Sequence, residues 1–90
     1  MPVDLAFELS YLLSDKLGED VEVKEWSFEP SDATLCVRVA TGTGEKRACI
    51  QVKPCKNITD EAKAARCIAK NLVNNEKLVE QLAEQLRGAS

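Results

Sequence analysis

Hydrophobic residues near the start of the chain recur with the spacing of an α-helix. Leucines at three- and four-residue steps would lie on one helical face: Leu5, Leu9, Leu12, Leu13 and Leu17. Pro2 suits the first turn of such a helix, and Gly18 suits its end. The pattern therefore predicts an amphipathic helix from Pro2 to Leu17.

Residues 21–29 have the period of two that is typical of a β-strand. Their apolar side chains fall first on odd and then on even positions: Val21, Val23, Trp26 and Phe28. A β-bulge near Lys24 and Glu25 would return all four to one face, because a bulge inserts one extra residue into a strand. We therefore expect a bulged strand here.

Two more strands follow, each bounded by turn residues. Residues 34–40 and 47–53 alternate between apolar and polar side chains, and the segments 30–32 and 41–44 carry the Pro, Ser, Asp and Gly of turns. The second turn predicts a hairpin, and Pro54 ends the last strand.

The remainder of the chain has helical periodicity again. Thr59 is the expected N-cap, and an apolar stripe follows it: Ala62, Ala65, Ile68, Ala69, Leu72 and Val73. Asn74 and Asn75 indicate a cap or kink before a further amphipathic segment that ends at Gly88.

The predicted fold is one α+β domain spanning residues 1–90, with the order helix, three-stranded antiparallel β-meander, helix, helix (αβββαα). All helices should cover one face of the sheet, because that face carries the apolar side chains. The other face is expected to expose a mixed set of residues: Thr34, Cys36, Arg38, Arg47, Cys49, Gln51 and Lys53.

Composition places the chain among soluble globular proteins. Apolar residues make up 44% and charged residues 30% of the chain, and no apolar run approaches the roughly 20 residues of a membrane span. The N-terminus lacks the basic and apolar regions of a secretory signal, so we expect a cytoplasmic protein without a membrane partner.

Four cysteines leave two interpretations open. Without a secretory signal the default is four reduced thiols, and the spacing contains no C-x-x-C pair of the kind that zinc sites use. Cys36 and Cys49 should point from adjacent strands to the open sheet face, where they would lie close enough to oxidise or to bind a ligand.

Catalytic chemistry is poorly represented. The chain has no histidine, which removes the commonest general base, the usual partner of a Ser or Cys nucleophile and the commonest metal ligand. Gly42 and Gly44 lie between two strands and do not open a helix, so they match no phosphate-binding loop. We expect a protein that is not an enzyme, with no cofactor and no metal.

Charge is divided unequally along the chain. Residues 1–45 contain three bases and ten acids, a net charge of −7, whereas residues 46–90 contain nine bases and five acids, a net charge of +4. A candidate basic surface comprises Lys53, Lys56, Lys63, Arg66 and Lys70. It is either a nucleic-acid contact or an ordinary solvated face, and the overall pI near 4.9 favours the latter.

Acidic residues gather around the first predicted strand and form a candidate partner surface: Glu19, Asp20, Glu22, Glu25, Glu29 and Asp32. They would either attract a basic partner, as in proteins that mimic phosphates, or simply protect an edge strand.

Phe7 and Tyr11 form a second apolar patch, rotated away from the leucine stripe. Either the last helix packs on this patch, which we favour, or the patch is a contact site for another chain, a second copy included.

The order of elements over residues 2–73 resembles that of double-stranded-RNA-binding domains. The resemblance includes the basic loop that leads into residues 59–66, the Ala-rich start of a helix. Size, acidic balance and topology also resemble those of small phage-encoded anti-CRISPR inhibitors. These resemblances imply, respectively, RNA binding through the basic surface and inhibition of a host nucleic-acid-binding complex.

We expect a small non-catalytic protein that acts through protein–protein contacts, as an inhibitor or adaptor. The alternatives are a nucleic-acid-binding module and a structural subunit of a homo-oligomer. The identity of a partner, the source organism and the oligomeric state do not follow from the residues.

Overall fold

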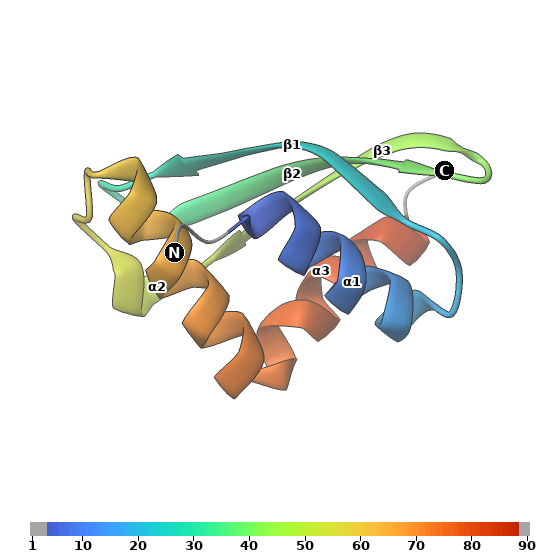
Figure 1. Cartoon of the computed structure of the whole chain (residues 1–90). Coiled ribbons are helices and arrows are strands. Elements are labelled where there is room, and N and C mark those ends of the chain that lie inside the picture. The colour runs from blue at the N-terminus through green and yellow to red at the C-terminus, as the bar shows by residue number, and fades with distance from the viewer. Residues whose placement is uncertain (1–3, 89–90) are drawn as a thin grey trace.

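The computed structural model describes residues 4–88 and has the predicted αβββαα order (Figure 1). Its elements are α1 (Leu5–Leu17), β1 (Glu22–Glu29), β2 (Thr34–Thr41), β3 (Gly44–Gln51), the 3-10 turn η1 (Lys53–Cys55), α2 (Glu61–Asn74) and α3 (Glu76–Gly88). The strands form one antiparallel sheet in the order β1-β2-β3, and the three helices lie on one side of it. The predicted α+β class is therefore confirmed.

Side-chain caps set the helix boundaries. The Asp4 carboxylate accepts a hydrogen bond from the Phe7 N–H at 3.1 Å and caps α1, which begins at Leu5. The predicted start at Pro2 lies outside the described residues. Gly18 ends α1 in the left-handed conformation with φ of 70°, which glycine adopts without a steric penalty.

The N-cap of α2 is Asp60, so the prediction of Thr59 was wrong by one residue. Asp60 has an extended backbone and its carboxylate accepts from the Lys63 N–H at 2.9 Å. The predicted break between the last two helices is confirmed. The Asn75 N–H donates to the Asn71 carbonyl, and the Asn75 side-chain oxygen accepts from the Lys77 N–H at 3.1 Å.

The predicted β-bulge is present, with a shift of register between Val23 and Glu25. Beyond it, Trp26 lies opposite Val37 and Phe28 lies opposite Leu35. Because both partners are buried, the bulge returns the two aromatic side chains to the helix-covered face, where they pack partly buried against the core.

The core fills the space between the sheet and the helices with leucine, valine, isoleucine and alanine side chains, and none of the buried residues among 4–88 is polar or charged. The predicted stripe of α2 was wrong at its margins. Ala62 and Val73 are exposed. Of the six predicted positions, these two lie farthest around the helix axis from the line of buried residues Ala65, Ile68 and Leu72.

Two disulfides link the cysteines, so the expectation of four reduced thiols was wrong. The register places Cys36 opposite Cys49 with 4.1 Å between their Cα atoms, and η1 brings Cys55 to 5.8 Å from Cys67 on α2. A zinc site would need free thiolates, and all four sulfurs are bonded in pairs. Disulfides are characteristic of oxidising compartments, so a cytoplasmic location stays a prediction with this feature against it.

Candidate interaction surfaces

The first half of the outer edge of β1 is closed by two serines of α1. The Ser14 hydroxyl accepts from the Val21 N–H at 2.9 Å and donates to the Val21 carbonyl, and the Ser10 hydroxyl accepts from the Val23 N–H at 2.9 Å. In Figure 1, α1 runs beside this part of the strand. These serines therefore satisfy edge groups that would otherwise be available to another strand.

The second half of the same edge is open. On β3, the Cys49 N–H and carbonyl both bond to the Gln85 side chain, so the Cys36–Cys49 pair exchanges no backbone hydrogen bonds. Cys36 must then bond to its other neighbour, Ser27, and the backbone groups of Trp26 and Phe28 point away from the sheet. Among residues 4–88 no group bonds to these outward N–H and carbonyl groups.

A groove of about 310 Å³ lies beside this open edge. One wall is formed by Trp26, Ser27 and Phe28, and the other by the segment before α2 and its first turns. The lining of the second wall includes Ile58, Glu61 and the buried Ala64. The groove thus places apolar side chains and the Glu61 carboxylate beside the unpaired backbone groups of β1.

The predicted acidic surface is a band along β1 and the turns at its two ends. All six side chains are exposed: Glu19, Asp20, Glu22, Glu25, Glu29 and Asp32. Two of them face a cation, since Glu22 lies 3.1 Å from the Lys24 ammonium and Glu25 lies 4.0 Å from the Arg38 guanidinium. The band is mostly uncompensated and flanks the open half of the β1 edge.

The predicted basic surface covers η1, the loop after it and one face of α2. Its five side chains are exposed and have no carboxylate of residues 4–88 within 4 Å: Lys53, Lys56, Lys63, Arg66 and Lys70. The Cys55–Cys67 disulfide fastens η1 to the middle of α2 and so joins the loop lysines to the helical ones.

Phe7 and Tyr11 are 69% and 67% exposed. The favoured expectation that α3 packs on them was wrong. α3 instead packs against α1 and the edge of β3, and the ion pairs described next place it on the opposite flank of α1. The alternative, a contact site for another chain, stays open.

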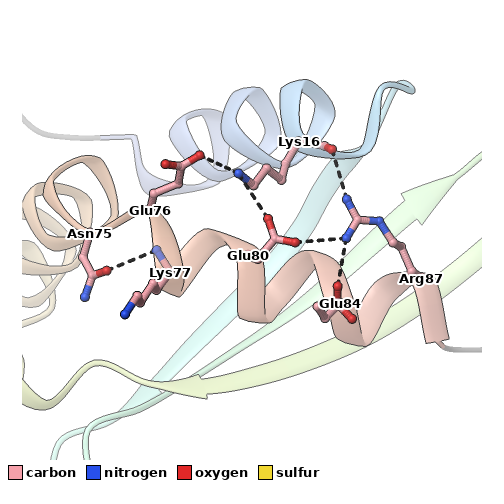
Figure 2. Close-up of polar contacts among 7 residues, drawn as sticks. All are labelled: Lys16, Asn75, Glu76, Lys77, Glu80, Glu84 and Arg87. Carbon is pink, nitrogen blue, oxygen red and sulfur yellow. Dashed lines mark hydrogen bonds and ion pairs between the residues drawn. The ribbon is translucent and has the colours of Figure 1, made fainter.

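A cluster of ion pairs joins α1 to α3 (Figure 2). The Lys16 ammonium lies 2.6 Å from a Glu76 oxygen and 3.1 Å from a Glu80 oxygen, while Arg87 pairs with Glu80 and Glu84 at 3.2 Å and donates to the Lys16 carbonyl. The hydrogen bonds that Lys16 donates to Glu76 and Glu80 raise the pKa of Lys16, and those that Glu80 accepts from Lys16 and Arg87 lower the pKa of Glu80. This cluster fastens two helices together.

Sequence reasoning did not identify the groove, although it contained one signal for it. The change of parity in residues 21–29 located the bulge, and the bulge is what turns Trp26 and Phe28 toward the helices. Nothing in the spacing of Ile58 and Ala64 shows that they lie across from that strand. The capping roles of Ser10, Ser14 and Gln85 also depend on contacts between distant segments.

None of the helices within residues 4–88 has the length and apolar character needed to cross a membrane. In comparisons with known proteins, no family model, curated protein or solved structure matches the chain significantly.

Proposed function

We propose that this chain is a non-catalytic binding protein that acts through protein–protein contacts, as an inhibitor or adaptor. The observation that carries the proposal is the exposure of Phe7 and Tyr11 on α1, although α2 and α3 were available to cover them. Large aromatic side chains are enriched at the centres of protein interfaces, where they gain most from leaving water.

The surroundings of the aromatic pair support a protein partner. Tyr11 is followed one helical turn later by the exposed Asp15, and the half-exposed Glu8 adjoins Phe7. An apolar centre with a charged rim is the usual anatomy of a transient interface. The absence of histidine from the sequence argues against a catalytic role for the same surface.

The more specific part of the proposal is that the chain acts as an inhibitor. The resemblance to phage-encoded anti-CRISPR inhibitors implies a host nucleic-acid-binding complex as the target. The exposed acidic band along β1 would then occupy positions that phosphates otherwise fill, and its charge would accelerate association with a basic protein.

Affinity capture from nuclease-treated lysate of the source organism, read by mass spectrometry, tests the proposal. Wild-type protein should retain a defined protein that the Phe7→Ser/Tyr11→Ser variant loses. Val73→Ser is the matched control, because Val73 is 62% exposed and lies on another helix. Equal capture by all three proteins would refute the role of the pair, and light scattering that shows a Phe7- and Tyr11-dependent dimer would replace the partner with a second copy.

A second candidate function, nucleic-acid binding, is favoured by the continuous run of unpaired cations on η1 and α2. It predicts an affinity that falls with salt, with a log–log slope that decreases by about one for each phosphate contact removed. Lys63→Ala and Lys70→Ala should each lower the slope, whereas Lys77→Ala on α3 should not. Undetectable binding to duplex RNA and DNA at low salt would exclude this function.

A further inference from the structure

We infer that the open half of the β1 edge is a docking site for an extended peptide in which basic and apolar residues alternate. The peptide would add a fourth strand to the sheet beside Trp26 and Phe28. This inference shares with the proposed function a polypeptide partner and the acidic side chains of β1, but it does not depend on the surface formed by Phe7 and Tyr11.

The backbone of β1 supplies the first recognition element. Trp26 and Phe28 each direct an N–H and a carbonyl outward, and residues 4–88 supply no partner for these groups. An extended peptide can satisfy them with the regular spacing of a β-ladder, which is how strand addition obtains affinity without reading side chains. The Ser10 and Ser14 caps limit the site to the half of the strand that follows the bulge.

The groove is the second recognition element. It selects the kind of side chain that the peptide carries on one of its two faces. Side chains of an added strand alternate between the two faces of the sheet. Those on the helix-covered face would enter the groove between Phe28 and Ile58, where Trp26, Pro30 and Ala64 also offer apolar contacts. Alternate positions of the peptide should therefore be apolar.

Charge is the third recognition element. It indicates which residues the peptide should carry at the positions that face the helix-free side of the sheet. On the helix-free face, the side chains of β1 that follow the bulge are Glu25, Ser27 and Glu29, all exposed. Glu25 lies 4.0 Å from the Arg38 guanidinium of β2, whereas Glu29 has no cation of residues 4–88 within 4 Å, and the Lys24 ammonium already pairs with Glu22. Lysine or arginine at the alternate positions would form cross-strand pairs with these acids.

The same charges disfavour a second copy of the chain as the occupant. Two β1 edges placed together would bring their own glutamates close to one another, and like charges on adjacent strands are destabilising. A basic peptide reverses the sign of that interaction.

The test uses ¹⁵N-labelled protein and synthetic nine-residue peptides with blocked ends. One peptide alternates lysine with valine, a second alternates glutamate with valine, and a third has the first composition in a non-alternating order. A fourth repeats the first with N-methyl groups on alternate residues, which removes backbone donors along one edge. The expected result is that the first peptide shifts the Trp26 and Phe28 amide resonances and slows their hydrogen exchange, while the others bind at least tenfold more weakly.

Two point variants separate this site from simple attraction between opposite charges. Glu29→Lys should weaken the lysine–valine peptide by about fivefold, since it converts an attractive cross-strand pair into a repulsive one. Glu84→Lys makes the same change of charge on α3, which packs against β3 at the other side of the sheet, and should leave the affinity within twofold.

Three results would overturn the inference: no binding of the first peptide, shifts centred on Phe7 and Tyr11, or equal affinity of the N-methylated peptide. The last two would still permit the proposed function, because protein capture through α1 does not depend on the β1 edge. Conversely, loss of lysate capture in the Phe7→Ser/Tyr11→Ser variant would leave the peptide result unaffected.

Discussion

The two edge strands of the sheet, β1 and β3, are covered by different helices and to different extents. An edge strand carries unpaired N–H and carbonyl groups, which are a template for association unless they are covered. On β3 the side-chain amide of Gln85 bonds to both backbone groups of Cys49, at 2.9 and 2.6 Å, and Lys46 donates to the Leu86 carbonyl of α3. Gln85 of α3 thus caps the Cys49 position of the β3 edge, whereas the outward backbone groups of Arg47 and Gln51, on either side of it, have no partner among residues 4–88.

The β1 edge is closed only where α1 reaches it. Ser10 and Ser14 cover its first half, whereas the half that contains Trp26 and Phe28 faces a groove. Since both edges belong to one three-stranded sheet, the difference lies in what the helices bring to each edge. What distinguishes the second half of β1 is the groove and the exposed acidic side chains beside its unpaired backbone groups, which are features that a partner strand could use.

The largest expected effect comes from loosening α3, the helix that caps Cys49 on the β3 edge. Leu82 of α3 is fully buried, and Leu82→Ala should lower the free energy of unfolding by about 3 kcal/mol, because it removes apolar contacts and leaves a cavity. Urea unfolding measures the loss. Native-state hydrogen exchange should show the Cys49 amide opening together with α3, and unchanged protection there would contradict the coupling of helix and edge.

Removing the Cys55–Cys67 disulfide should loosen the far wall of the groove. The bond closes a loop with a sequence separation of 12, so Cys55→Ala/Cys67→Ala should cost about 3 kcal/mol in the chain-entropy description. Cys36→Ala/Cys49→Ala, with a separation of 13, is the matched control for loop length. Hydrogen exchange should quicken around η1 and α2 in the first variant and across β2 and β3 in the second, and the same pattern in both would be evidence against separate roles.

A smaller effect is expected from removing the Gln85 side chain, which caps Cys49 on the β3 edge. Gln85→Ala should lower stability by about 1 kcal/mol and expose the Cys49 N–H to exchange, because the amide is the only partner that residues 4–88 give that group. Gln81→Ala, one turn earlier on α3, removes an exposed amide with no hydrogen bond to residues 4–88 and should be neutral. In wild-type protein the Cys49 amide should exchange more slowly than that of Phe28.

The smallest effect concerns the ion pairs between α1 and α3. Glu80 has a pKa below its usual 4.5, so its stabilising contribution is present above pH 4.5 and is lost as the pH falls through the folded-state pKa. Lys16 has a pKa above its usual 10.5, so its contribution is present below pH 10.5 and is lost as the pH rises through the folded-state value. Glu80→Gln should therefore be destabilising at pH 7 and should approach wild-type stability in acid, as measured by urea unfolding at each pH. A difference that grows toward low pH would contradict this assignment.

Much of the fold could be predicted from local pattern, because the information lies in neighbouring residues. The leucine spacing of α1 and the parity change that locates the β-bulge both come from short windows, as does the Asn75 break between α2 and α3. The alternation of residues 34–53 also predicted that Cys36 and Cys49 would share the open face of the sheet. The error at Thr59 is a displacement of the N-cap by one residue.

The tertiary structure alone decided which surfaces are covered. Helical periodicity shows that Phe7 and Tyr11 share a face, but whether α3 packs there depends on the route of the chain after Asn75. The pairing of Cys55 with Cys67 and the capping of Cys49 by Gln85 likewise join segments that are distant in sequence. Periodicity is a property of one segment, whereas burial, disulfide pairing and an open edge depend on how two segments meet. For that reason the groove beside β1 could be identified only from the tertiary structure.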